Sequence, residues 1–91
     1  MKLTALDLGV DLITDVTPLA GMVNLEFLFM EGNLISDISP LVANPGLGAG
    51  DSINLRENCL DLTPGTRAAE DLAALLARGA WVGSENQACG H

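Results

Sequence analysis

Apolar and polar residues are arranged along this chain in a pattern that returns after 22 residues. Eight positions recur in two copies, which read Leu3, Leu6, Leu8, Ile13, Asp15, Val16, Pro18 and Leu19 in the first and Leu25, Leu28, Met30, Ile35, Asp37, Ile38, Pro40 and Leu41 in the second. A fixed period of roughly 20 to 30 residues is typical of a solenoid, because one such repeat cannot bury its apolar side alone and must stack on its neighbours. Solenoids present extended surfaces, so the pattern favours recognition over catalysis.

Each repeat is expected to begin with a short strand, because apolar residues occur there at every second position. The strands fall within residues 3–9, 25–32 and 52–57. Their inward side chains are aliphatic, namely Leu6, Leu8, Leu28, Met30, Ile53 and Leu55. The third strand follows the second after 25 residues, and we place the extra residues in the Gly- and Pro-rich loop 43–52.

A residue with an amide or carboxyl side chain follows each strand. These residues are Asp11, Asn33 and Asn58. An asparagine side chain both donates and accepts hydrogen bonds, so a ladder of them can satisfy turn backbone that would otherwise be buried unpaired. Asp11 can only accept, which is tolerable in the exposed first repeat.

The returns between the strands are too short and too often broken by proline for long helices, and we expect turns or 3₁₀ segments there. A helix is expected at about residues 64–78, with Thr63 as its N-cap. Its apolar stripe consists of Ala68, Ala69, Leu72, Leu75 and Leu76, with Ala73 as a further candidate. A short last strand at 80–82 then turns Trp81 outward, and residues 83–91 are expected to form a flexible tail.

The strings LTALDLGVDLITDVTPLAGMVNL and LEFLFMEGNLISDISPLV resemble the 22-residue leucine-rich repeats of the internalin-like class of bacterial proteins. The segment 44–82 is similar to the closing section of such arrays. The resemblance implies an α/β fold: a short right-handed leucine-rich-repeat solenoid with a parallel sheet of three to four strands, 3₁₀ or turn returns on the convex side and one C-terminal helix. Its repeats would span about 3–24, 25–46 and 47–62 within a domain of residues 1–82.

Four residues depart from the family pattern and mark weaker repeats, namely Asp11, Met22, Asn44 and Cys59. The resemblance implies a protein-interaction module, commonly part of a secreted or surface-attached protein. It carries over no catalytic residues, because the repeats of this family have none.

Composition narrows the range of partners. The 91 residues carry a formal charge of −8. An acidic chain repels phosphate backbones and anionic membrane surfaces, so we expect neither nucleic acid nor membrane insertion. No apolar stretch approaches the roughly 20 residues of a membrane span. Met1-Lys2 leads directly into the first repeat without a secretory signal. The chain is therefore expected to be cytoplasmic if complete, or secreted or at the cell surface as part of a longer protein.

The outward side chains of the strands are the candidate binding residues. One outward row is predicted to read Asp7, Phe29, Asn54 and Trp81, and its neighbour Ala5, Phe27 and Ser52. All the aromatic side chains of the chain fall on this face, and exposed aromatic residues near the centre of a sheet are typical interface anchors. We therefore predict a protein partner on the concave face of the sheet, contacted by Phe27, Phe29, Glu31, Asn54, Arg56 and Trp81.

An alternative is open at this point. The two phenylalanines could shield one another while Trp81 closes the end of the solenoid. The chain would then be a purely structural C-terminal cap of a larger leucine-rich-repeat surface protein, without binding activity of its own.

The first repeat has no capping element before it. Terminal repeats need a polar cap, and a naked strand edge recruits other strands. We expect either truncation from a longer array or self-association through this N-terminal edge. The alternative is that Met1-Lys2 and the negative charge keep the chain monomeric.

Candidate chemistry is sparse. The acidic residues do not form the dense alternating pattern of a calcium loop, so no metal is expected, and Asp15 and Asp37 are expected to cap their own turns. Cys59 and Cys89 could pair, with independent free thiols as the default expectation. The single histidine, His91, ends the chain and has no fixed neighbour. We therefore expect neither a cofactor nor enzymatic activity.

Overall fold

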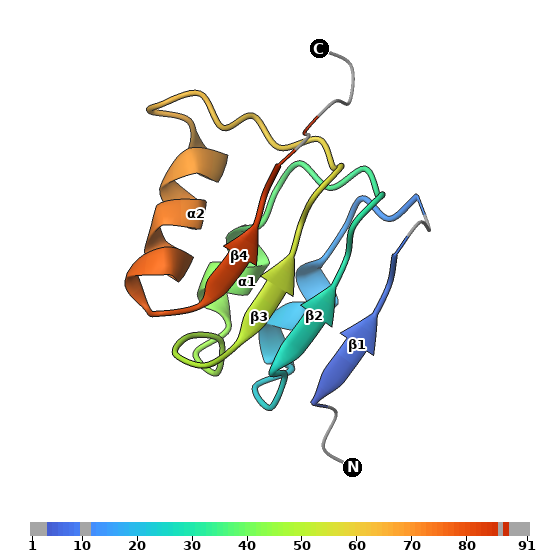
Figure 1. The fold of residues 1–91 in the computed structure, drawn as a ribbon, viewed down its shortest axis with the longest axis vertical. Coiled ribbons are helices and arrows are strands. Elements are labelled where there is room, and N and C mark those ends of the chain that lie inside the picture. Colours follow the sequence, from blue (N-terminus) through green and yellow to red (C-terminus); the bar gives the residue numbers. More distant parts are fainter. Residues whose placement is uncertain (1–3, 10–11, 86, 88–91) are drawn as a thin grey trace.

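The computed structural model describes residues 4–9, 12–85 and 87. They form a small α/β domain with a four-stranded parallel sheet and two helices (Figure 1). The elements in chain order are β1 (Ala5–Asp7), the 3₁₀ segment η1 (Thr17–Gly21), β2 (Phe27–Phe29), α1 (Ser39–Ala43), β3 (Ser52–Asn54), α2 (Arg67–Ala77) and β4 (Trp81–Gly83). The strands lie side by side in the order in which the chain forms them.

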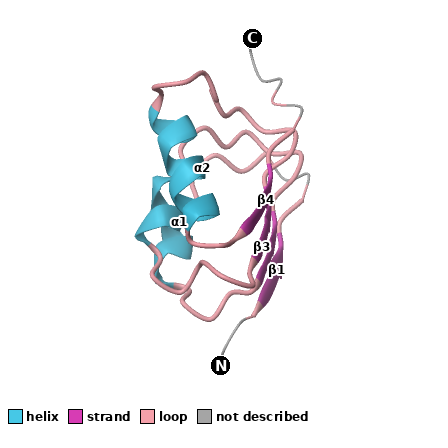
Figure 2. Ribbon diagram, turned by 60° about the vertical axis from the view of Figure 1, so that its left-hand side comes forward, coloured by secondary structure: helices cyan, strands magenta, loops and turns pink. Residues whose placement is uncertain are grey.

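The domain has two layers (Figure 2). The sheet forms one layer, and the helical segments lie together on one side of it. Within the helical layer, α1 contacts both η1 and α2, and α2 also contacts β4. The opposite side of the sheet is left uncovered by the part of the chain that the structure describes. We call this uncovered side the outer sheet face.

The register of the sheet decides which side chains share a row. The central inward row reads Leu6, Leu28, Ile53 and Val82. The two outward rows read Ala5, Phe27, Ser52 and Trp81, and Asp7, Phe29, Asn54 and Gly83. Trp81 therefore does not lie in the row of Phe29 and Asn54 as predicted, but in the row of Phe27.

The end of α2 explains this difference. The backbone N–H of Gly79 donates to the carbonyl of Leu76 at 3.0 Å, and that of Ala80 donates to Leu75 at 3.3 Å. This pattern is a Schellman motif, and Gly79 adopts the left-handed conformation that it requires, with φ 92°. The motif keeps residues 79 and 80 with the helix, so β4 begins only at Trp81 and ends one residue later than predicted.

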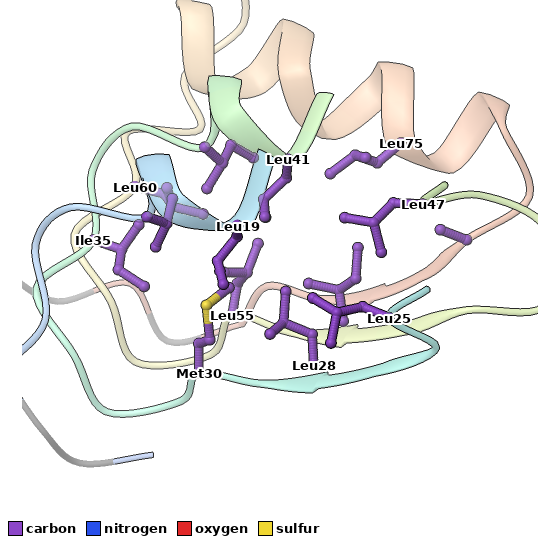
Figure 3. Packing of buried hydrophobic residues seen from close by; sticks show 14 of the residues in the cluster. Leu19, Leu25, Leu28, Met30, Ile35, Leu41, Leu47, Leu55, Leu60 and Leu75 are labelled. Carbon is purple, nitrogen blue, oxygen red and sulfur yellow. The ribbon is translucent and has the colours of Figure 1, made fainter. Parts of the chain in front are cut away.

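The inward side chains build an aliphatic core, as the alternation predicts (Figure 3). Leu28 and Met30 from the second repeat and Ile53 and Leu55 from the third are fully buried. The returns and α2 contribute the facing side chains, among them Leu19, Leu41, Leu47, Leu60 and Leu75. Full burial of one such side chain stabilises the fold by about 1.5 to 3 kcal/mol. The aromatic side chains lie outside this core.

The two returns differ in their helical form. The first is the 3₁₀ segment η1, as predicted, whereas the second is the short α-helix α1, so the domain has two helices rather than the one expected. Because α1 is packed between two neighbours, a full α-helical turn is supported there. Each return begins beside an aspartate: Asp15 accepts the N–H of Thr17 and Asp37 that of Ser39, both at 2.9 Å. The predicted capping role of both aspartates is confirmed.

The start of α2 lies three residues later than predicted. Its N-cap is Thr66, whose hydroxyl accepts the N–H of Ala69 at 3.2 Å. Gly65 has φ 94°, which no helix accommodates, so the expected start at Thr63 and Pro64 is excluded. The predicted apolar stripe is buried at Ala68 and Leu75 and partly buried at Leu72, whereas Leu76 is exposed.

The side chains of Asn44 and Arg78 cap the C-terminal ends of the two returns. Asn44 is fully buried, and its Nδ2 donates to the carbonyls of Leu19 and Met22 at 2.9 and 3.0 Å. One repeat later, Nη2 of Arg78 donates to the carbonyl of Val42 at 2.6 Å. The last carbonyls of a helix have no partner within the helix, so both side chains act as caps. Asn44 thus makes a specific polar contact at a fully buried position.

Asn33 and Asn58 join successive repeats. Nδ2 of Asn58 donates to the carbonyls of Met30 and Leu55 at 2.9 and 3.0 Å, and its Oδ1 accepts the N–H of Ile35 at 3.1 Å. Asn33 makes the equivalent bonds one repeat earlier. Both asparagines are buried. They satisfy the inner side of each turn, where no water is available.

Gln87 continues this ladder into the segment that was predicted to be a flexible tail. Its Nε2 donates to the carbonyl of Leu55 at 2.7 Å, and its Oε1 accepts the N–H of Leu60 at 3.0 Å. Sequence reasoning missed this position because it holds a longer amide and follows Asn58 after an irregular interval. Asp11, the predicted first member of the ladder, lies outside the described residues.

Cys59 is disulfide-bonded, so the free thiol expected as the default at this position is a wrong prediction. Cys89, the other cysteine of the sequence, lies outside the described residues. The backbone N–H of Cys59 donates to the carbonyl of Ile35 at 2.9 Å, which ties the turn after Asn58 to the preceding repeat.

Candidate functional site

The outer sheet face carries exposed aromatic side chains at the positions that the alternation predicts. In β2, Phe27 and Phe29 are 46% and 38% exposed, while Leu28 between them is 0% exposed. In β4, Trp81 is 52% exposed. Aromatic side chains bring a large contact area with few rotatable bonds, which makes them effective anchors when a partner covers them.

The strand between β2 and β4, which is β3, carries short polar side chains on the outer sheet face. Ser52 of β3 lies between Phe27 and Trp81, and Asn54 lies between Phe29 and Gly83. Neighbouring strands are about 4.8 Å apart, so the backbones that carry the outer aromatic residues are about 10 Å apart. Large apolar side chains thus flank a lower, polar strip along β3.

Trp81 belongs to a cluster with Arg56 and Glu85. The guanidinium carbon of Arg56 lies 5.6 Å from the centre of the Trp81 ring, within cation–π range. Nε of Arg56 lies 2.5 Å from Oε2 of Glu85. An exposed cation–π contact contributes about 0.5 to 1 kcal/mol, so these contacts hold the indole in place more than they stabilise the fold. Glu85 is a member that sequence reasoning missed, because it falls in the predicted tail.

Gly83 makes room for this cluster. A Cβ atom at this position would lie 2.9 Å from Cη2 of Trp81 and 3.2 Å from Nε of Arg56. The indole and the guanidinium therefore lie directly over the backbone of β4. Any side chain at this position would have to displace them.

The other predicted contact residues lie on the same face with different partners. Oδ1 of Asn54 accepts the backbone N–H of Arg56 at 3.1 Å, which closes the turn after β3. Glu31 is half-buried, and its carboxylate lies over Gly9. Arg56 forms an ion pair with Glu85.

The carboxyl groups with shifted pKa values lie away from the outer sheet face. Hydrogen bonds from the side chain and backbone of Thr17 lower the pKa of Asp15, and those from Ser39 lower the pKa of Asp37. Burial raises the pKa of Asp71 in α2, partly offset by Arg67. The first two groups are engaged in their turns, and within the described residues no three His, Cys, Asp or Glu side chains gather as metal ligands.

A second surface feature lies at the β1 end of the domain. An apolar hollow of about 340 Å³ opens there. Its lining consists of Leu6, Leu8, Ile13, Asp15, Val16, Pro18, Leu19 and Met22. Leu3, the first apolar position of the repeat pattern, lies outside the described residues, as does His91.

Among the described segments, no helix has the length and apolar character needed to cross a bilayer. Comparison with known proteins found no matching family model, no matching curated protein and no matching solved structure.

Proposed function

We propose that this chain is a protein-interaction module of the internalin-like leucine-rich-repeat kind, which binds a protein partner on the outer sheet face. The solenoid part of this proposal is supported by four parallel strands in sequence order whose equivalent residues lie side by side. It is also supported by the amide side chains of Asn33, Asn58 and Gln87, which connect repeat to repeat.

One observation carries the binding role: the aromatic side chains of Phe27, Phe29 and Trp81 are exposed on the uncovered side of the sheet. Contiguous apolar patches on the surface of a protein commonly mark interaction sites. The strip of Ser52 and Asn54 between them offers hydrogen-bonding groups to an approaching backbone. Arg56 and Glu85 would form the polar rim around these anchors. The role is binding rather than catalysis.

Site-specific crosslinking tests this proposal without knowledge of the partner. A photoreactive phenylalanine analogue replaces Phe29 in cells that naturally contain the chain, and a matched version carries it at the exposed Ser36 on a return. We expect a discrete protein adduct from position 29 and none from position 36. Absence of an adduct at 29, or the same adducts from both positions, would contradict the proposal.

A second set of variants separates binding from folding. Phe27→Ser and Trp81→Ser remove exposed surface, so each should abolish the adduct while the Tm falls by less than about 8 °C, which corresponds to about 1 kcal/mol in a domain of this size. A larger fall in Tm with the adduct retained would indicate that the aromatic residues serve the fold.

The second candidate function is a structural one, in which the chain is the closing section of a larger array. The open hollow beside β1 favours it, because Leu6 and Leu8 are only half-buried there. In that case the crosslinker at position 29 would yield no partner.

A further inference from the structure

One edge of β1 is not paired with any strand of the described residues. It is the first strand of the sheet and pairs only with β2 within the described chain. The N–H of Leu8 donates to the carbonyl of Phe29 at 2.7 Å, and the carbonyl of Thr4 accepts the N–H of Phe27 at 3.0 Å. Because peptide groups alternate in direction along a strand, those of Ala5 and Asp7 face away from the sheet. Such an edge is a template for one more strand.

The hollow lies on the inner side of this edge. Leu6 and Leu8 line it and are half-buried, whereas their counterparts in β2, Leu28 and Met30, are fully buried. The interior of the domain is therefore accessible at this end. Apolar side chains from an added strand would cover the same surface that β2 covers on β3.

The charged side chains that the structure describes around the edge are acidic. Residues 3–55 contain seven Asp and Glu residues and no Lys or Arg, whereas Lys2 precedes the strand and lies outside the described residues. Asp7 is exposed on the outer side of β1, and the carboxylate of Glu31 lies over Gly9 at the end of the same strand. A second copy of this chain would bring the same charges to the contact, whereas a basic strand would be attracted.

We propose that the edge of β1 binds an extended segment of a partner protein in which apolar residues alternate with lysine or arginine. The segment adds a strand beside β1, and its backbone pairs with Ala5 and Asp7. Its apolar side chains enter the hollow, and its basic side chains face Asp7 and Glu31. This site lies at the edge of β1, beside the outer sheet face, and does not depend on the function proposed for the aromatic residues.

Synthetic peptides of about seven residues test the proposal. One alternates leucine with lysine, and the control alternates leucine with glutamate. Titrated into the ¹⁵N-labelled chain, the basic peptide should shift the amide signals of residues 4–8 and of the hollow and bind at least about tenfold more tightly than the acidic one. Added salt should weaken it. No binding, equal binding of both peptides, or shifts confined to β4 or to Phe29 would overturn the proposal.

Two variants test whether the edge of β1 is the binding site of the basic peptide. Ala5→Pro removes an outward N–H and should abolish binding of the basic peptide. Asp7→Lys should reverse the preference between the two peptides, whereas Glu70→Lys on α2, which makes the same charge change far from the edge, should leave it unchanged. If Ala5→Pro prevents folding, Asp7→Lys decides: an unreversed preference refutes the proposal. Light scattering of the chain alone completes the test, because a stable dimer that Ala5→Pro dissociates would assign the edge to a second copy.

Discussion

At the scale of single residues, the turn before each ladder asparagine demands a left-handed backbone. Gly32 meets this demand with φ 74°, and Glu57 occupies the equivalent position one repeat later with φ 58°. This conformation destabilises a residue with a Cβ atom by about 1 kcal/mol. The two repeats thus form the same turn, but the turn at Glu57 is more strained than the turn at Gly32.

Replacing Glu57 with glycine should stabilise the domain. We expect the free energy of unfolding in urea to rise by about 0.5 to 1 kcal/mol, because the strain disappears while the hydrogen bond from the N–H of residue 57 to the carbonyl of Glu85 is kept. The mirror variant Gly32→Ala should lower the free energy of unfolding by about 1 kcal/mol. An unchanged or lower stability of Glu57→Gly would contradict this account of the turn.

Asp37 and Asp71 should affect stability with opposite dependence on pH. The hydrogen bonds of Ser39 lower the pKa of Asp37 in the folded state, so its contribution is present above about pH 4 and is lost as the pH falls through the lowered pKa. Burial raises the pKa of Asp71, so ionisation of this carboxyl group destabilises the folded state. The destabilisation is absent below about pH 4 and grows as the pH rises through the raised pKa.

Thermal melting at two pH values checks both signs. Asp37→Ala should lower the Tm at about pH 7 and have a smaller effect at about pH 2.5. Asp71→Asn should raise the Tm at about pH 7 and have little effect at about pH 2.5. Parallel behaviour of the two variants would show that the assigned causes are wrong.

At the scale of the elements, the amide ladder connects strands that pairing alone joins only over three residues each. Asn58→Ala would leave the carbonyls of Met30 and Leu55 and the N–H of Ile35 without this partner. We expect a loss of about 2 to 4 kcal/mol in urea unfolding. Asn24→Ala, at an exposed turn, should change stability by less than about 0.5 kcal/mol. Similar losses in both variants would contradict the role of the ladder.

The alternation of apolar residues was enough to predict the strands and their inward faces, because burial on one side imposes a period of two. Leu28 and Ile53 therefore lie where expected. The start of α2 was not predictable from residue types, since Thr63 and Thr66 are both competent N-caps and only the φ of Gly65 distinguishes them. The register of β4 was set by the Schellman turn, which spacing alone does not reveal.

At the scale of the whole molecule, charge is distributed unevenly along the chain. The net charge is −8, and all three arginines follow residue 55. Repulsion among the carboxylates should destabilise the compact state at low ionic strength. We expect the Tm at neutral pH to rise as the NaCl concentration increases from about 0.01 M to about 1 M. Most of the rise should occur at low salt, before the screening length becomes shorter than the distances between the charged side chains. A falling Tm would show that attractive pairs such as Arg56 and Glu85 outweigh the repulsion.

The candidate site was predictable in part for the same reason as the sheet. Once the period placed Leu28 inward, Phe27 and Phe29 had to face outward. The contacts of Arg56 could not be predicted, because its partner Glu85 lies in a segment without apolar periodicity. The repeat pattern predicts that the first repeat lacks a cap but not that a hollow opens there, since this depends on what surrounds Leu6 and Leu8 in space.

The hydrogen bonds of Gln87 have a practical consequence for anyone who expresses this domain. Composition suggests trimming the chain after β4 or fusing a reporter there. Such a cut removes the acceptor of the Leu60 amide and the donor to the Leu55 carbonyl, so the last turn would lose its inner support. Affinity tags and fluorescent labels therefore belong beyond residue 87.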